Sequence, residues 1–242
     1  MNKIFTFSPN FYQNNRGPKE IEFVIIHYTG MQSEIDSLKR LKNPKSKVSC
    51  HYLINRKGKI IQMVEEKDIA WHAGKSKWNK FNNLNFNSIG IELVNRGHKF
   101  GYQNFPKTQI KTLIALCKNL KKKYRIKNEN FLGHSDIAPI RKIDPGEKFP
   151  WEKLSKYGLG KWYHKYKNSS KLDLEKSKLD LKKIEKAFFK NLKKIGYRYF
   201  NVHKRDKKDK KIIKSFQQHF LPKNITGVID KKTYKISHYL AY

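Results

Sequence analysis

Short strand-like runs alternate with helical segments up to about residue 155, and this alternation limits the folds open to the chain. The β-branched run Glu22–Tyr28 (EFVIIHY) predicts a buried strand, and Ser88–Asn95 (SIGIELVN) predicts another. Ser33–Leu41 has helical apolar spacing with Ser33 as its N-cap, and Pro106 opens a longer helix that ends near Tyr124. We therefore expect an α/β domain with a mixed central β-sheet flanked by helices.

A tight turn joins two further strand-like runs. Ser49–Asn55 and Lys59–Val64 are separated by the segment Asn55–Gly58, which ends in a glycine. Such a segment between two apolar runs is typical of a β-hairpin, and Gly58 can adopt the positive φ that the turn requires. We therefore expect these two runs to pair within the sheet.

The composition of the chain changes after residue 156. Residues 157–171 contain two glycines and an Asn-Ser-Ser run, which is typical of a linker. Residues 172–242 are rich in lysine and show helical apolar spacing without a convincing strand pattern. The sequence thus predicts a first domain over residues 1–156, a linker over 157–171 and a small all-α domain over 172–242.

The formal net charge is +34, from 54 basic and 20 acidic residues. Such a charge could gather nucleic-acid phosphates, attract carboxylate-bearing substrates, or reflect a compositional bias toward Lys, Asn and Ile. The lysines are spread along the chain, whereas a dedicated nucleic-acid site usually concentrates them in one stripe. This distribution favours the compositional explanation and disfavours nucleic acid as a partner.

Nothing in the sequence indicates secretion or membrane insertion. The apolar stretch near the N-terminus is too short and too interrupted for a signal-peptide core, and no apolar run approaches the length of a membrane span. Cys50 and Cys117 lack a metal-binding or disulfide-framework spacing. We therefore expect a soluble, unprocessed protein in the cytoplasm.

Five polar residues stand out as candidates for chemistry. His27 and His134 lie at or after strand-like runs, and Asp144 follows in a loop stiffened by prolines. Two histidines and one aspartate can hold Zn²⁺ and leave a fourth position for water. Glu92 could take a proton from that water, and Lys142 could stabilise a developing oxyanion. Together these groups would suffice for amide hydrolysis.

Each of these residues also has a purely structural explanation. A lone histidine after a strand is more often a hydrogen-bonded structural residue, and Lys142 is one of many lysines. Glu92 is harder to explain in this way, because a carboxylate within an apolar strand needs a reason to be there. Cys50 and His51 might suggest a thiol nucleophile, but adjacent strand residues point to opposite faces and cannot pair simply.

Six short segments between about residues 20 and 152 match one known family in order. They read VIIHYT (24–29), VSCHYLI (48–54), AWHAG (70–74), SIGIEL (88–93), GHSDIAP (133–139) and KIDPG (142–146). Together they resemble the type 2 N-acetylmuramoyl-L-alanine amidases, the AmpD/AmiD-like branch of the peptidoglycan-recognition fold. Cys50 departs from the small residue that many members of this family carry.

The resemblance implies a specific set of functional residues. One Zn²⁺ per chain would be held by His27, His134 and Asp144. Glu92 would be the catalytic base, and Lys142 would be the cation that stabilises the oxyanion. The resemblance also places four residues near the substrate groove: Tyr28, Thr29, His72 and Arg141.

The C-terminal region resembles a second, smaller module. The segments IKSFQQHF (213–220) and ITGVID (225–230), followed by Thr233, are similar to the three-helix peptidoglycan-binding domain that often accompanies such amidases. In this interpretation Asp230 caps the last helix. A helical bundle that only buttresses the catalytic domain is the alternative.

The implied activity is zinc-dependent hydrolysis of the amide bond between the lactyl group of N-acetylmuramic acid and L-alanine. The implied partners are peptidoglycan, muropeptides or 1,6-anhydro-muropeptides, in wall turnover and recycling. The alternative is a non-catalytic peptidoglycan-recognition protein, which the presence of all three ligands and the base disfavours. A wall-binding C-terminal domain would favour a periplasmic or secreted location, reached by an unrecognised route, over the cytoplasm.

Overall fold

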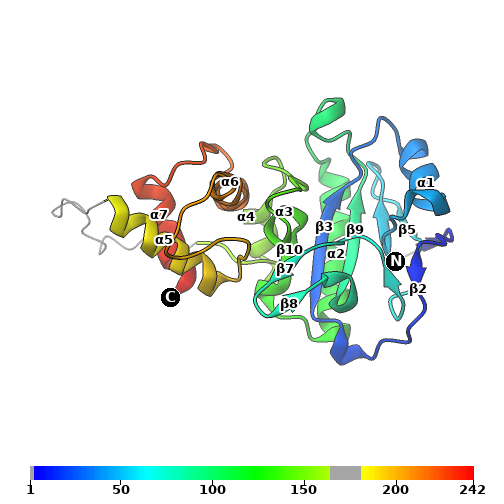
Figure 1. Ribbon diagram of the computed structural model, residues 1–242. Helices are drawn as coiled ribbons and strands as arrows, with labels where there is room; N and C mark the ends of the chain where they lie inside the picture. The colour runs from blue at the N-terminus through cyan, green and yellow to red at the C-terminus, as the bar shows by residue number, and fades with distance from the viewer. Residues whose placement is uncertain (1–2, 164–180) are drawn as a thin grey trace.

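A six-stranded mixed β-sheet forms the centre of the computed structural model, which describes residues 3–163 and 181–242 (Figure 1). Strands β4 and β5 pair antiparallel, and the other neighbouring strands pair parallel. In spatial order the strands are β1 (Lys3–Phe5), β5 (Ile60–Gln62), β4 (Tyr52–Ile54), β9 (Ser88–Leu93), β3 (Phe23–Tyr28) and β10 (Phe131–Gly133). The predicted mixed α/β class is confirmed.

Helices and short strand pairs surround this sheet. The helices of the first part are α1 (Glu34–Lys42), α2 (Lys107–Tyr124), α3 (His134–Ile137) and α4 (Trp151–Ser155). Two small sheets pair β2 (Phe11–Tyr12) with β6 (Ile69–Ala70), and β7 (Lys77–Trp78) with β8 (Phe81–Asn82). Five 3₁₀ turns are η1 (Pro18–Glu20), η2 (Pro44–Ser46), η3 (Leu84–Asn87), η4 (His98–Phe100) and η5 (Asn128–Asn130).

The predicted hairpin is present, although its strands are shorter than the apolar runs. The Asn55 amide donates to the Lys59 carbonyl, and Gly58 has a φ of 85°. Ser49 lies outside β4 because it pairs elsewhere: its amide donates to the Trp71 carbonyl, and its hydroxyl accepts from the Trp71 amide. The predicted cap of α1 is confirmed, since the Ser33 hydroxyl accepts from the Asp36 amide.

Strand β9 separates the core from the site side of the sheet. Its residues Ile89, Ile91 and Leu93 are buried in one cluster with the apolar face of α2, which includes Leu113 and Cys117. The alternate residues therefore point to the opposite face. On that face a Cβ atom at position 90 would lie 2.3 Å from the His72 ring, so only glycine leaves room for this histidine.

The described part of the C-terminal region, residues 181–242, contains the helices α5 (Leu181–Ile195), α6 (Asp209–Phe220) and α7 (Lys231–Ala241). They lie beside the β10 end of the sheet, with α6 nearest to α3 (Figure 1). Their apolar residues form one buried cluster with residues of the sheet, such as Phe188 and Phe216 with Phe23 and Leu132. The predicted cap of α7 is confirmed, because the Asp230 carboxylate accepts from the Thr233 amide.

The predicted domain boundaries stay predictions. Residues 164–171 of the predicted linker lie outside the described residues, as do residues 172–180 of the predicted helical domain. In the described part of the linker, Leu159 is fully buried in the core under α2. None of the helices in the described ranges is both long and apolar enough to cross a membrane.

The packing of His72 against Gly90 leads to a stability prediction. Gly90→Ala should lower the free energy of unfolding by about 1–3 kcal/mol, because the added methyl group overpacks the His72 ring. Gly17→Ala is the control, since its Cβ would make only an ordinary contact 3.5 Å from Glu20. Urea unfolding of both variants measures the difference, and equal effects at the two positions would contradict the packing argument.

Candidate active site

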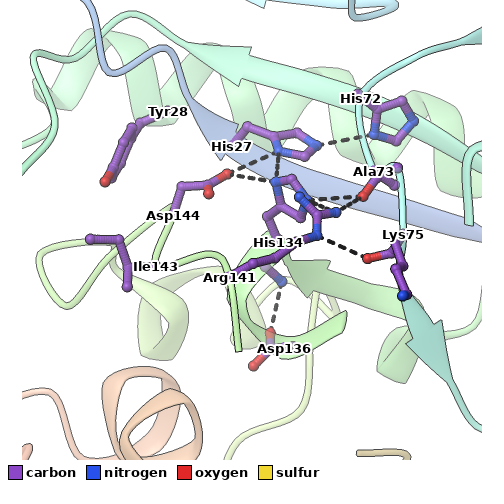
Figure 2. A network of polar contacts seen from close by, with 12 residues as sticks. His27, Tyr28, His72, Ala73, Lys75, His134, Asp136, Arg141, Ile143 and Asp144 are labelled. Atoms are coloured by element: carbon purple, nitrogen blue, oxygen red, sulfur yellow. Dashed lines mark hydrogen bonds and ion pairs between the residues drawn. The ribbon is translucent and has the colours of Figure 1, made fainter. Parts of the chain in front are cut away.

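Three potential metal ligands converge at the carboxyl ends of two neighbouring strands. His27 lies in β3, and His134 follows β10 directly. These strands pair parallel with Gly133 opposite Ile26, so the next residue on each strand emerges at the same edge. Asp144 reaches the same point from the loop after α3, and all three residues are buried (Figure 2).

The distances between the donor atoms are short and nearly equal. His27 Nδ1 lies 2.9 Å from His134 Nδ1 and 3.0 Å from Asp144 Oδ2, and His134 Nδ1 lies 3.1 Å from Asp144 Oδ2. Donors around a tetrahedral Zn²⁺ with bonds of about 2.0–2.1 Å are separated by about 3.3 Å. The triangle is therefore close to the size that one small cation requires.

The second nitrogen of each histidine ring shows which nitrogen is free to bind a metal. His134 Nε2 lies 3.1 Å from the Ala73 carbonyl and 3.2 Å from Arg141 Nη2, which itself donates to that carbonyl. Donation from Nε2 to this carbonyl, which can only accept, leaves the lone pair on Nδ1. His27 Nε2 lies 3.0 Å from His72 Nδ1, and His72 Nε2 lies 3.2 Å from Ser88 Oγ. A proton on His27 Nε2 is donated to His72 Nδ1, and His72 Nε2 in turn donates to Ser88 Oγ. This leaves the lone pair of His27 on Nδ1, which faces His134.

The protonation states that metal binding requires are also favoured. Burial and the neighbouring His134 lower the pKa of His27 to about 4, so this ring is neutral at pH 7. Burial alone would raise the pKa of Asp144, but His134 and His27 outweigh it and hold the pKa well below its ordinary value. Imidazole nitrogens with free lone pairs and one carboxylate are donors that Zn²⁺ accepts, so the residues fit the metal.

Glu92 lies one strand away from these ligands, directly opposite His27 in the β3–β9 pair. Its side chain lines the same pocket, and its Oε2 atom is buried without a hydrogen-bond partner among the described residues. Burial raises the pKa of Glu92 to about 8, with a further contribution from Asp144. A carboxylate with an unused oxygen beside three metal ligands is placed to exchange protons with a bound molecule.

The pocket above the three ligands has a volume of about 570 Å³. Lys142 lines it and is partly exposed. Tyr28 and Thr29 also line it, but both hydroxyls have internal partners: Tyr28 Oη lies 3.0 Å from His98 Nδ1, and Thr29 Oγ1 donates to the Asn95 carbonyl.

The other two residues expected in the groove, His72 and Arg141, also line the pocket, and both have internal hydrogen-bond partners. His72 connects His27 to Ser88, as described above. Arg141 Nε donates to the Lys75 carbonyl at 3.0 Å, and Arg141 Nη2 donates to the Ala73 carbonyl (Figure 2). Arg141 therefore holds the segment that supplies the hydrogen-bond acceptor for His134.

His98 lines the pocket, although no sequence pattern indicated it. Its ring stacks on Tyr102 with 4.3 Å between centroids, and its Nε2 atom lies 3.0 Å from Glu147 Oε2. His98 lies in the loop after β9, near the strand edge where His27 lies. This position after a predicted strand is the sequence feature that could have indicated its place in the site. Other lining residues that the sequence did not indicate include Met31, Arg40, Lys99 and Phe100.

Comparisons with known proteins agree on one family. The family model described as N-acetylmuramoyl-L-alanine amidase matches residues 17–147. The chain is 36% identical to the N-acetylmuramoyl-L-alanine amidase AmiD of Escherichia coli (strain K12) over 235 residues, covering 91% of this chain and 82% of AmiD. It is 35% identical to the 1,6-anhydro-N-acetylmuramyl-L-alanine amidase AmpD of Haemophilus influenzae over 164 residues, covering 60% of this chain and 86% of AmpD.

A solved structure of AmiD from E. coli also resembles the whole fold. It has a TM-score of 0.75 and 34% sequence identity, and the match covers 91% of this chain and 88% of that one. That structure is a complex with the substrate anhydro-N-acetylmuramic acid-L-Ala-D-γ-Glu-L-Lys.

The raised pKa of Glu92 predicts how the stability of the metal-free protein depends on pH. The unfolded carboxyl ionises near 4.5, whereas the folded one keeps its proton up to about pH 8. Between these values the unfolded state releases a proton that the folded state retains, so this group makes folding less favourable as pH rises. Glu92→Gln cannot ionise, and its stability relative to the unsubstituted protein should increase with pH.

The measurement is the difference in Tm between the two proteins in excess chelator, at about pH 5 and about pH 8. Chelator keeps the comparison free of metal, which would itself lower the pKa of a nearby carboxyl. A Tm difference that is the same at both pH values would show that Glu92 has no raised pKa.

Proposed function

The chain belongs to the N-acetylmuramoyl-L-alanine amidase family, and we propose that its catalysis uses one Zn²⁺ held by His27, His134 and Asp144. As a member of this family, it hydrolyses the amide bond between the lactyl group of N-acetylmuramic acid and L-alanine. The observation that carries the proposal is the triangle of three donor atoms, 2.9–3.1 Å apart, beside the unpaired carboxylate oxygen of Glu92.

The residues of the chain have separate tasks in this reaction. A Zn²⁺ bound by the three ligands would supply a water of lowered pKa and polarise the scissile carbonyl. Glu92 accepts a proton from the water whose oxygen attacks the carbonyl carbon. Lys142 stabilises the negative charge that develops on the carbonyl oxygen. As the C–N bond breaks, Glu92 returns the proton to the nitrogen of the departing L-alanine.

The positions of these residues support the assignment. Glu92 lies opposite His27 in neighbouring parallel strands. A water at the metal ligands is therefore close enough to give a proton to Glu92. Burial raises the pKa of Glu92 above its ordinary value and a bound cation would lower it again, so this group is suited to both accept and return a proton. Lys142 is two residues from Asp144 in the same loop, and its side chain lines the pocket.

We infer that the substrates are muropeptides, including 1,6-anhydro forms, and intact peptidoglycan. The AmiD complex contains an anhydro-muramyl peptide, and the name of AmpD specifies 1,6-anhydro-N-acetylmuramyl-L-alanine. The presence of three ligands and a base disfavours a purely binding function. We propose wall turnover and recycling in the cytoplasm as the role. The alternative is a periplasmic or secreted enzyme whose helices α5–α7 bind the wall.

Substitutions separate metal binding from proton transfer. Glu92→Gln should bind zinc as the unsubstituted protein does but lower kcat/KM by about 10²–10⁴-fold, because the general base is lost. His27→Ala should lose both zinc and activity. Mass spectrometry of muropeptide cleavage, together with the zinc content of each protein, measures both effects. Glu65→Gln, which changes an exposed surface ion pair with Lys67, is the control and should retain activity.

The choice between substrates is tested on two materials. Purified sacculi and soluble 1,6-anhydro-muropeptides are incubated with the enzyme, with and without chelator, and the products are identified by mass spectrometry. Release of stem peptides beginning with L-alanine from both materials, abolished by chelator, is the expected result. Undiminished cleavage after complete zinc removal would exclude the zinc mechanism.

A further inference from the structure

One face of helix α6 is turned toward the segment from α3 to the following loop, which carries His134 and Asp144. Lys211, Ser215, Gln218 and His219 have the spacing of a single helical face, and each contacts the segment 135–143. Another face, with Ile212 and Phe216, is buried in the C-terminal core. In Figure 1, α6 is the C-terminal helix nearest to α3 and α4.

Two side chains of α6 fix the backbone beside the ligands. Ser215 Oγ donates to the Ser135 carbonyl at 2.8 Å, and the Ser135 amide donates to the Asp144 carbonyl at 2.8 Å. Gln218 Nε2 donates to the Ile143 carbonyl at 2.6 Å. The residue after His134 and the residue before Asp144 are thus held by groups 75–80 positions further along the chain.

A buried carboxylate adds a third connection. Asp136, which is 1% exposed, accepts hydrogen bonds from the Gly133 amide at 2.7 Å and from Tyr197 Oη at 2.6 Å. His219 Nδ1 lies 2.8 Å from the second oxygen of the pair, Oδ2, and the His219 ring stacks on Trp151 with 4.1 Å between centroids. One bond thus comes from the residue before His134, and two come from the C-terminal region.

The ligand segments need such support because little regular structure holds them. His27 is fixed by ladders on both sides of β3, to β9 and β10. His134 lies in a helix of four residues, and Asp144 lies in a loop. Removing the partners of the Ser135 and Ile143 carbonyls would leave polar groups unpaired and the loop free to shift.

We propose that α6 is part of the metal site's support, and that Ser215 and Gln218 are positioning residues for His134 and Asp144. The inference rests on the proposed zinc site. Because the donor atoms must stay within a few tenths of an ångström of their geometry, outer partners that fix ligand segments contribute to metal affinity. The C-terminal helices therefore contribute to the metal site, whatever else they bind.

The experiment measures zinc affinity in the full-length protein. The dissociation constant is determined by competition with a fluorescent chelator, at a temperature where circular dichroism shows each variant to be folded. Gln218→Met and Ser215→Ala should each weaken zinc binding about tenfold, at the lower end of the ~10–100-fold range for outer-shell partners. The milder Ser215→Ala keeps the test available if Gln218→Met does not fold.

The chain offers a matched control for each variant. Gln217 is buried beside Gln218, but its amide bonds to Gly227 and Val228 in the turn between α6 and α7. Ser237 is likewise buried and bonds to Tyr234 and Asn191. Gln217→Met and Ser237→Ala should lower Tm but leave zinc affinity within about twofold, which separates positioning from general stability.

The outcomes distinguish this inference from the proposed function. Weaker zinc binding in the two α6 variants but not in the controls supports it. Unchanged affinity in Gln218→Met and Ser215→Ala, or equal weakening in the controls, overturns it while the zinc site stands. If His27→Ala binds zinc as tightly as the unsubstituted protein, the ligand set is wrong, and both the proposed function and this inference fail.

Discussion

The structure depends on holding two unprotonated imidazole nitrogens and a carboxylate oxygen about 3 Å apart in a buried place. Lone pairs at this separation repel one another unless a cation lies between them. Burial increases this repulsion, because little water reaches the site to screen the donor atoms from one another. The rest of the fold can be understood as the framework that enforces this arrangement and keeps its donors in the state that binds a metal.

Two kinds of support enforce it. The sheet fixes His27 through parallel ladders, and the chain from His27 through His72 to Ser88 sets its ring. Gly90 leaves room for the His72 ring, because any side chain at position 90 would displace this histidine. His134 and Asp144 are held differently. Arg141 fixes the Ala73 carbonyl that accepts from His134, and α6 binds the backbone beside both ligands. A site assembled from segments so far apart in the sequence combines rigidity with one open face, where the pocket lies.

Much of this fold could be predicted from local patterns. The alternation of β9 correctly separated Ile89 and Ile91 from Glu92, the turn at Gly58 gave the hairpin, and Ser33 and Asp230 were recognised as caps. Each of these features is set by residues close together in the chain. The three potential ligands could be named because they lie in recognisable motifs after strand-like runs, and the structure brings them together.

The remaining features depend on tertiary packing that no local pattern encodes. His98 lies in a loop without periodicity, and only the neighbouring strand ends bring it to Tyr28. Arg141 and His72 were expected in the groove, but their hydrogen bonds show that they also hold the ligands and their segment. The polar face of α6 has the composition of an ordinary helix surface, so its contacts with the ligand loop were not foreseeable.

The most direct test of the central claim is X-ray absorption spectroscopy at the zinc edge on the zinc-loaded, full-length protein. The account predicts a first shell of two imidazole nitrogens and oxygen donors at about 2.0–2.2 Å, with one position held by an exchangeable water. A shell that contains sulfur, or four ligands all supplied by protein side chains, would contradict it.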